Sequence, residues 1–464
     1  MSVNTISDLG QRLRGRVIDR DHPDYDEVRA LYNGMIDKRP LLIAECLDAA
    51  DVVASVAYAH ESALPVAIRG GGHNGPGLGS VDDGLMIDLS KMRGVRVDAE
   101  HSTVRVAAGC TTGDVDHATH AYGLAVPFGI VASTGVAGLT LGGGMGYLSR
   151  QYGLTIDNLL EADVVLADGR LVTASMSSYP DLFWGLRGGG GNFGVVTSFL
   201  FRAHPVSQVY GGPVFWDFEH ARAVMRAYRE FLPGAPEEWG FFVGLKTVPS
   251  VHPFPEEHWG KRACAVIGCY NGPAERGADV MRGLLDVLPA PLFNWIDQMP
   301  FPAAQGMFDP LLPKGLQWYW RGEFVNVLTD EAIEDHLAHT KDMPGALSLM
   351  HLYPIDGAVH RVSPNDTAWN ARSATWAMVI AGIDPDPQKA GDLATWARRY
   401  WAAIHAHTRA GGYVNFMMGD GDRARLSATY GDNYQGLAAL KAKYDPTNFF
   451  RKNQNIPPAA EGPG

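Results

Sequence analysis

Glycine is concentrated in three short segments of this chain, and these segments limit its fold more than any other feature. The first, residues 69–74 (RGGGHN), lies between two apolar stretches, residues 64–68 and 85–89, that are typical of buried strands. Glycine lacks a Cβ, so backbone N–H groups in such a turn can approach an anionic group closely. The turn ends near His73, whose imidazole is a nucleophile. The pattern favours a cofactor cradle, with a plain glycine-rich hairpin and an exposed histidine as the alternative.

The second and third glycine segments strengthen the cradle interpretation. Residues 134–146 (TGVAGLTLGGGMG) mix glycine with apolar residues without helical or strand periodicity, as expected of backbone that lies flat against a planar ligand. Residues 181–196 (DLFWGLRGGGGNFGVV) predict a helix, a glycine loop and a strand. None of the three fits the dinucleotide fingerprint, which needs a strand, G-x-G-x-x-G and a helix in one unit. The sequence therefore argues against a nicotinamide-binding Rossmann site.

Length and charge limit the class of protein. A chain of 464 residues exceeds the size at which one hydrophobic core usually stops growing, which predicts two domains. The net charge of −12 argues against a nucleic-acid partner, because a basic surface supplies most of that affinity. The four cysteines lack metal-ligand spacing, and His117 and His120 lack a third ligand, so we expect no metal. The absence of a signal pattern and of long apolar runs predicts a cytoplasmic enzyme without a membrane partner.

Several separated motifs occur in the order that is found in one known family. They are the three glycine segments and residues 24–25 (DY), 32–40 (YNGMIDKRP), 444–450 (YDPTNFF) and 453–457 (NQNIP). In these motifs, which span nearly the whole chain, the sequence resembles the FAD-linked oxidases of the vanillyl alcohol oxidase/para-cresol methylhydroxylase superfamily. Within that superfamily it is most similar to the bacterial type of the berberine bridge enzyme-like branch.

The resemblance implies an α+β fold with two domains. Residues 1–205 and 410–464 would form a two-part FAD-binding domain of the para-cresol methylhydroxylase (PCMH) type. Residues 206–409 would form a substrate-binding domain built on an antiparallel sheet covered by helices. The sequence pattern agrees with this division, because short apolar strands alternate with helix-like stretches only up to about Phe201.

The resemblance also implies that FAD is held covalently, through a bond between a ring nitrogen of His73 and the 8α-methyl carbon of the isoalloxazine. Such a bond needs a neutral imidazole as nucleophile. Val131 stands where many relatives have a second, cysteine link, and Cys110 lies outside that motif, so we expect a single link. The family pattern assigns cofactor contacts to Arg69, Gly70, Gly71, Gly72, His73, Asn74, Thr134, Gly135, Gly138, Gly142, Gly143, Val196, Asn415, Asn453 and Asn455.

Three positions that hold acid–base residues in relatives are apolar here. They are Met145, Phe416 and, counted from Arg372, Met378. The base therefore lies elsewhere, or hydride leaves without strong base assistance. The remaining polar candidates are Tyr413, Asn415, His351, Tyr353, His360 and Tyr319, each of which is also typical of an ordinary sheet position. Tyrosine titrates near pH 10, so Tyr413 would need a positive field, and Arg372 is one source.

These observations predict a FAD-dependent oxidoreductase. Hydride would pass to flavin N5 from a C–H bond of a hydroxylated (alcohol, sugar or phenolic) or amine-bearing small molecule, and the electrons to molecular oxygen or another acceptor. In relatives, valine at the position of Thr134 admits oxygen, and threonine is close to valine in size, which favours an oxidase. A dehydrogenase with another acceptor and a flavin-binding protein without turnover stay open as alternatives. Trp318 and Trp320 are typical of an aromatic cleft and equally of a sheet core.

Overall fold

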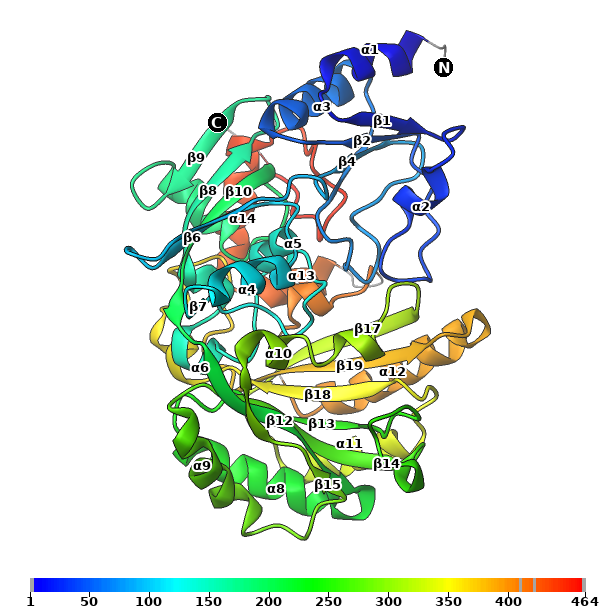
Figure 1. Ribbon diagram of the computed structural model, residues 1–464. Coiled ribbons are helices and arrows are strands. Elements are labelled where there is room, and N and C mark those ends of the chain that lie inside the picture. The colour runs from blue at the N-terminus through cyan, green and yellow to red at the C-terminus, as the bar shows by residue number, and fades with distance from the viewer. Residues whose placement is uncertain (1–3, 409–410, 420–422, 461–464) are drawn as a thin grey trace.

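The computed structural model describes residues 4–408, 411–419 and 423–460. The chain forms two halves that are stacked one above the other in Figure 1. The upper half contains the N-terminal segments and the C-terminal helices, and the lower half contains the green to orange segments between them. The expected boundary at residues 409 and 410 lies outside the described residues, so the domain limits stay a proposal.

The first sheet of the upper half positions the first glycine segment. Strands β2, β4 and β3 run parallel, and β1 pairs antiparallel with β2. At the carboxyl end of β3, Arg69 forms an ion pair with its register partner Asp88, which is fully buried at the end of β4. This pair fixes the point at which the glycine turn leaves the sheet. The bounds are β1 (Arg16–Asp19), β2 (Leu42–Glu45), β3 (Val66–Arg69), β4 (Leu85–Asp88), α1 (Asn4–Arg12), α2 (Tyr25–Arg29) and α3 (Ala49–Glu61).

The second sheet of the upper half is antiparallel and positions the other two glycine segments. Its order is β5-β6-β10-β8-β9. The third glycine segment joins α7 to β10, as predicted. The expectation of aperiodic backbone over residues 134–146 is wrong in part, because Val136–Leu141 forms a short helix, α5, that buries Val136 and Leu141. The other bounds are β5 (Val95–Asp98), β6 (Thr103–Ala107), α4 (Thr112–His120), α6 (Ser149–Tyr152), β8 (Leu159–Val165), β9 (Leu171–Ser175), α7 (Pro180–Leu186) and β10 (Val195–Arg202).

The described residues of the lower half form an eight-stranded sheet of antiparallel pairs, with β16 pairing beside the order β15-β12-β14-β13-β18-β19-β17. Helices α8, α9 and α11 cover its lower face, and α12 packs on β17 and β19. The bounds are β12 (Gln208–Asp217), β13 (Phe242–Thr247), β14 (Arg262–Tyr270), β15 (Phe293–Asn294), β16 (Asp297–Pro300), β17 (Gln317–Val325), β18 (Leu349–Pro354), β19 (Trp376–Asp384), α8 (Ala221–Phe231), α9 (Gly277–Leu285), α10 (Phe301–Gln305), α11 (Asp330–Lys341) and α12 (Ala390–His405). This is the helix-covered antiparallel sheet that the sequence predicts.

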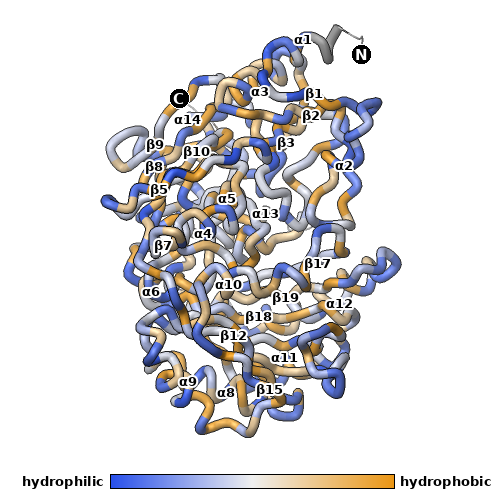
Figure 2. The backbone as a smooth tube through the Cα atoms, in the orientation of Figure 1, coloured by the Kyte–Doolittle hydropathy of each residue, from blue (hydrophilic) through white to orange (hydrophobic). Residues whose placement is uncertain are grey.

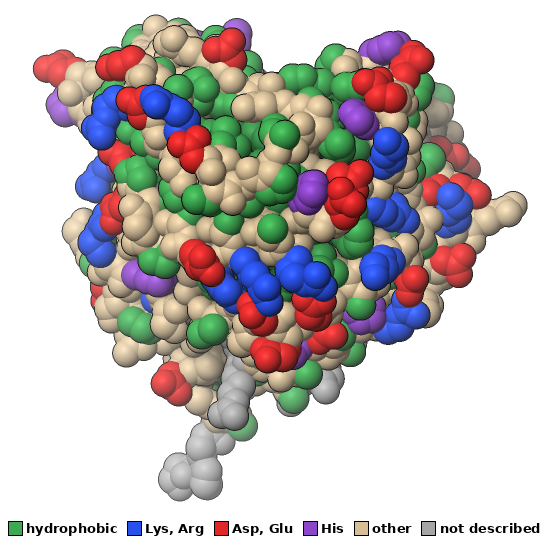
Figure 3. Space-filling model, turned by 90° about the horizontal axis from the view of Figure 1, so that it is seen from below, with side chains coloured by type: hydrophobic (Ala, Val, Ile, Leu, Met, Phe, Trp, Pro, Cys, Tyr) green, Lys and Arg blue, Asp and Glu red, His purple; other side chains and the backbone are tan. Residues whose placement is uncertain are grey.

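Polarity follows the layers. Apolar segments concentrate along the strands, and hydrophilic segments concentrate in the outer loops and helix ends (Figure 2). On the face seen from below, positive and negative side chains lie side by side (Figure 3), and ion pairs such as Arg222–Glu334 join α8 to α11. Within the described ranges, no helix combines the length and apolar character that crossing a bilayer requires.

A buried ion pair joins the C-terminal segment to the upper half. Lys441, on α14 (Asn433–Tyr444), is fully buried, and its Nζ donates to the Oδ2 of Asp445 at 2.7 Å. The same ammonium donates to the carbonyls of Asn192 (2.7 Å) and Phe450 (2.9 Å). Burial lowers the pKa of Lys441, and the bond to Asp445 opposes that shift. The pair therefore attaches the chain after α14 directly to the third glycine segment.

We expect Lys441→Met to lower the free energy of unfolding by about 3–5 kcal/mol, because it leaves the Asp445 carboxylate buried without its partner. Urea denaturation followed by tryptophan fluorescence measures this loss. The matched control is Lys443→Met on the same helix, whose exposed pair with Asp181 should contribute less than about 1 kcal/mol. Equal losses in the two variants would contradict a structural role for the buried pair.

Candidate functional site

A cavity of about 340 Å³ lies between the two halves. Its upper walls come from the three glycine segments, from residues 129–131 and from C-terminal residues 413–416 and 450–454. Its lower wall is the upper face of the large sheet together with residues from the loop before β17. The lower lining residues are Phe308, Leu312, Trp318, Trp320, Leu349, His351, Tyr353, Val379 and Ala381. Segments far apart in the sequence therefore meet at one space.

Two glycines bring the first and second glycine segments together. A Cβ placed on Gly71 would lie 2.4 Å from the backbone nitrogen of Gly135, and one placed on Gly135 would lie 2.2 Å from the nitrogen of Gly71. Glycine is therefore required at Gly71 by neighbouring protein backbone, and because Gly71 also lines the cavity its contact with a cofactor stays a prediction. Gly138 differs, since a Cβ there would meet nothing within 4 Å although the residue lines the cavity. Gly138 thus leaves space for a ligand.

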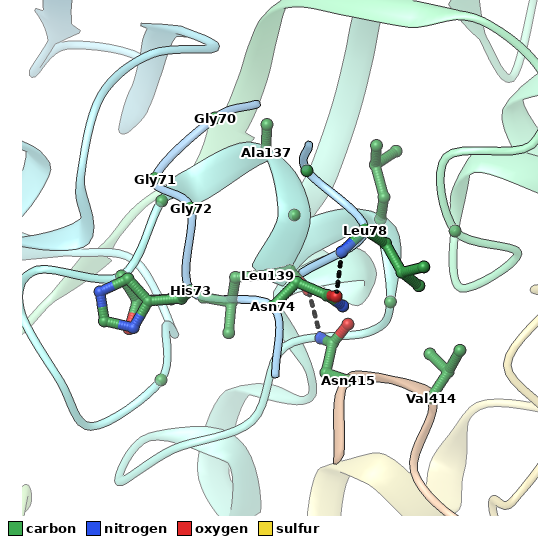
Figure 4. Close-up of a pocket in the computed structure, with 18 of the residues that line it drawn as sticks. Gly70, Gly71, Gly72, His73, Asn74, Leu78, Ala137, Leu139, Val414 and Asn415 are labelled. Atoms are coloured by element: carbon green, nitrogen blue, oxygen red, sulfur yellow. Dashed lines mark hydrogen bonds between the residues drawn. The ribbon is translucent and has the colours of Figure 1, made fainter. Parts of the chain in front are cut away.

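His73 lies at the end of the first glycine turn and lines the cavity (Figure 4). Its ring stacks on Tyr32 with the centroids 3.8 Å apart, and its Nε2 is 3.1 Å from the Oγ of Ser133. Burial lowers the pKa of His73 to about 4, so the imidazole is neutral at pH 7. A neutral ring has a free nitrogen lone pair, which is the nucleophilic form. Tyr32 and Ser133 hold that ring in one orientation.

Asn415 connects the C-terminal segment to the second glycine segment. Its Nδ2 donates to the carbonyl of Leu139 at 3.1 Å and to the Oη of Tyr413 at 2.8 Å. Figure 4 shows Asn415 reaching this segment opposite Asn74, whose Oδ1 accepts the backbone N–H of Leu78 at 2.9 Å. A Cβ on Gly142 would lie 2.1 Å from the Oδ1 of Asn415, so a glycine is required there.

Tyr413 is suited to donating a hydrogen bond rather than to accepting a proton. Its Oη accepts the backbone N–H of Gly144 at 2.9 Å and the amide of Asn415. Burial raises the pKa of Tyr413 to about 12, and these two donors only oppose that rise. The idea that Arg372 supplies a positive field is corrected, because its guanidinium pairs with both carboxylate oxygens of Asp157, at 2.8 and 2.7 Å. Tyr413 therefore stays a neutral hydroxyl at the cavity wall.

The strongest proton acceptor in the lower wall is His351 on β18. Its side chain is buried but lines the cavity, and its Nδ1 is 2.8 Å from the Oη of Tyr353. The Nε2 of His351 has no hydrogen-bond partner among the described residues. Burial lowers the pKa of His351 well below its usual value and raises that of Tyr353, so both groups are neutral at pH 7. One unpartnered ring nitrogen is left for a ligand.

Strand alternation corrects two sequence assignments. Successive side chains on a strand point to opposite faces. On β17, Trp318 and Trp320 line the cavity, whereas the Oη of Tyr319 accepts from the Nε of Arg398 on α12 at 2.8 Å. On β19, Val379 and Ala381 line the cavity, whereas Met378 is buried outside its lining. The residues that do face the cavity from β19 are also apolar, so this strand supplies no base.

Three further candidates lie outside the lining. Gly143 is close to the rings of Trp369 (3.1 Å from a Cβ placed there) and Tyr413, and its φ of +128° requires glycine. His360 bonds the carbonyl of Ala374 at 2.9 Å, and Asn455 follows the last lining residue, Gln454. The Oδ1 of Asn455 is buried without a partner among the described residues, so the cofactor contacts of Gly143 and Asn455 stay predictions, whereas the bond of His360 to Ala374 is structural. The other candidate cofactor contacts all line the cavity: Arg69, Gly70, Gly71, Gly72, His73, Asn74, Thr134, Gly135, Gly138, Gly142, Val196, Asn415 and Asn453.

The walls suit a large, flat and anionic ligand such as FAD. Gly138 and Gly191 each leave open space, since a Cβ on either would meet nothing within 4 Å. The Oδ1 of Asn453 is buried without a partner in the described chain, and Lys452 adds a positive charge. No Asp or Glu occurs among the lining residues that the structure describes. Sequence reasoning missed Lys452, Gln454 and Tyr32, although Tyr32 begins one of the quoted motifs.

Comparisons with known proteins agree with this fit. Residues 40–175 match the FAD binding domain family, and residues 412–457 match the berberine and berberine-like family. An uncharacterized FAD-linked oxidoreductase of Bacillus subtilis is 31% identical over 96% of this chain and 98% of its own length. The (R)-6-hydroxynicotine oxidase of Paenarthrobacter nicotinovorans is 30% identical over 96% of this chain and 97% of its own.

The fold has matches among solved structures. The 6-hydroxy-D-nicotine oxidase from Arthrobacter nicotinovorans superimposes with a TM-score of 0.86 at 25% identity, over 96% of this chain and 98% of that one. A BBE-like protein of Physcomitrella patens also gives a TM-score of 0.86, at 22% identity, over 98% of this chain and 100% of that one. The predicted α+β fold is thereby confirmed.

We expect Gly71→Ala to separate the first two glycine segments, because the added methyl would overlap the backbone of Gly135. The free energy of unfolding should fall by about 1–3 kcal/mol, as for other overpacked sites, and purified protein should contain less FAD. Absorbance at the flavin band and chemical denaturation measure the two effects. Gly70→Ala is the control, since its nearest contact would be an ordinary 3.5 Å to Ala137. Full FAD content and stability in Gly71→Ala would contradict the close backbone approach.

Proposed function

This chain belongs to the berberine bridge enzyme-like family of FAD-linked oxidoreductases, and on that premise we propose that it is an oxidase of small molecules whose FAD is bonded covalently to His73. The substrate would carry a hydroxyl or an amine on the carbon that is oxidised. One observation supports this most directly: the same glycine-lined cavity contains a neutral His73 and the Nε2 of His351, which has no partner among the described residues.

The chain supplies binding and orientation. FAD, when bound, takes two electrons as hydride from a substrate C–H bond and later passes them to an acceptor. Gly138 and Gly191 leave room for the cofactor, and Asn453 and Lys452 offer polar contacts from the C-terminal segment. His73 would provide the covalent bond, and Tyr32 and Ser133 orient its ring.

The proton of the substrate hydroxyl or amine would pass to the Nε2 of His351. The Nδ1 of His351 is bonded to the Oη of Tyr353, which holds the ring in one orientation and leaves Nε2 as the acceptor. A buried imidazole is a weak base, so proton transfer would accompany hydride loss rather than precede it. Tyr413, with its Oη fixed by Gly144 and Asn415, would donate a hydrogen bond to the ligand.

Two features support oxygen as the acceptor and a small substrate. Thr134, with a side chain close in size to valine, lines the cavity at the position that admits oxygen in similar proteins. A full-length relative named an oxidase of 6-hydroxynicotine supports both a small hydroxylated substrate and oxidase activity. A dehydrogenase that uses another acceptor is the alternative, and the experiment below separates the two.

We expect His73→Ala to release its flavin when the protein is precipitated with acid, whereas the wild-type pellet should stay yellow. The single link follows from Val131, which lines the cavity without a thiol, and from Cys110, which is buried. Mass spectrometry of a wild-type digest should find flavin on the His73 peptide alone. A flavin-bearing cysteine peptide would contradict the single link, and a colourless wild-type pellet would contradict covalent attachment.

We expect His351→Asn to slow anaerobic flavin bleaching by about 10²-fold or more, because asparagine cannot accept the proton. A panel of alcohols, sugars, phenols and amines identifies a reducing substrate, and stopped-flow absorbance measures the rate. Tyr319→Phe is the control and should be unchanged, because Tyr319 faces α12. Admitting air should then restore the yellow colour within seconds in an oxidase. Persistent bleaching would favour the dehydrogenase, and an unchanged rate in His351→Asn would exclude this proton acceptor.

A further inference from the structure

Lys246 is a buried cation that the proposed mechanism does not use. It lies on β13, and only 6% of its surface is exposed. Its Nζ is 5.5 Å from the centroid of the Phe308 ring. Within the described chain, this Nζ donates no hydrogen bond and lies in no ion pair with a carboxylate. Lysine is almost never buried unless it is paired, because the desolvated ammonium costs free energy. Among the residues that the structure describes, nothing compensates the charge of Lys246.

Lys246 lies on the same face of the sheet as His351. Strand β13 pairs with β18, so Lys246 is opposite Leu349, and Gly244 is opposite His351. Because alternate residues share a face, Gly244 and Lys246 face the same side. A Cβ on Gly244 would lie 2.9 Å from the Cδ2 of His351, so the missing side chain leaves room for the imidazole. Leu349 and His351 both line the main cavity, which places Lys246 next to its wall.

A small cavity beside Lys246 shares lining residues with the main one. It has a volume of about 10 Å³, and Lys246, Phe308, Leu312 and Leu349 are among its lining residues. The last three also line the main cavity. A space of this size holds about one water molecule or one carboxylate oxygen. Among the described residues, neither cavity is lined by Asp or Glu, so the ammonium faces apolar side chains and no compensating charge.

We propose that the substrate of this enzyme carries a carboxylate and that Lys246 binds it. This inference rests on the proposed function, because the hydroxyl or amine to be oxidised would then face the Nε2 of His351. The carboxylate would accept charge-assisted hydrogen bonds from Nζ, which satisfies both buried groups. Phe308 and Leu312, which line both cavities, would contact the apolar part of the molecule. The substrate class is therefore a small hydroxy or amino acid with an apolar body.

Calorimetric titration of the holoenzyme with benzoate and with benzamide tests the proposal, because the two probes match in shape and differ in charge. At pH 7 benzoate should bind at least about tenfold more tightly. Lys246→Met should abolish this preference and leave benzamide affinity within about twofold. Lys341→Met, at an exposed position on α11, should keep the preference. Equal affinity for the two probes in the wild type, or an unchanged preference in Lys246→Met, would overturn the proposal.

The pH dependence of the wild type provides a second test that needs no variant. Burial lowers the pKa of Lys246 to about 8. Benzoate affinity should therefore fall as the pH rises through 8, while benzamide affinity stays level; a flat benzoate profile would overturn the proposal. The other ionisable groups on the adjoining segments are Asp309 beside Phe308, His351 and Tyr353 on β18, and Arg262, Cys264, Cys269 and Tyr270 on β14. If Lys246→Met loses this pH dependence, Lys246 is the group whose titration causes it.

These titrations measure binding without turnover, so their failure is distinct from failure of the oxidase proposal. If a neutral alcohol or amine bleaches the flavin and benzoate shows no preference, only the carboxylate site is wrong. If benzoate shows the preference and nothing in the substrate panel bleaches the flavin, the oxidase proposal is wrong.

Discussion

The backbone contact between Gly71 and Gly135 is the constraint on which the rest of the site depends. Two turns from different parts of the upper half meet there, with a separation that no side chain on either residue would allow. The contact places His73 beside Ser133 and leaves Gly138 facing open space. The ion pair of Arg69 with Asp88 holds one turn, and the bond from the N–H of Thr112 to the carbonyl of Thr134 (2.9 Å) holds the other. This part of the upper wall of the cavity is therefore made of backbone held from both sides.

Desolvation determines the chemistry of the walls. The lower wall is mainly aromatic and aliphatic, and the few polar groups in it are buried. Burial disfavours charge, which keeps His73 and His351 neutral and Tyr413 protonated near pH 7. A neutral His351 can accept a proton, and a protonated Tyr413 can donate a hydrogen bond. Lys246 differs, because with a pKa of about 8 it stays mostly protonated at neutral pH without a partner.

Predictions from glycine segments and motifs agree with the structure better than predictions of which face of a strand a residue occupies. The turn around Gly71, the loop after α7 and the motif around Asn453 were predicted to line the site, and they do. The predictions for Tyr319 and Met378 were wrong for one reason, which is that a shift of one residue along a strand exchanges the two faces of a sheet. Counting along the sequence from Arg372 does not fix that register, because backbone pairing with neighbouring strands sets it.

The sequence by itself determined the fold class and the residues of the glycine cradle, because glycine spacing and ordered motifs are local properties that need no knowledge of distant contacts. Only the tertiary structure showed that the backbone of Gly135 also requires glycine at Gly71. It also decided that, within the described ranges, the Nε2 of His351 has no partner and no carboxylate pairs with Lys246 nearby. Those properties depend on burial and on partners from other strands, which the packing of the sheet creates and no local pattern records.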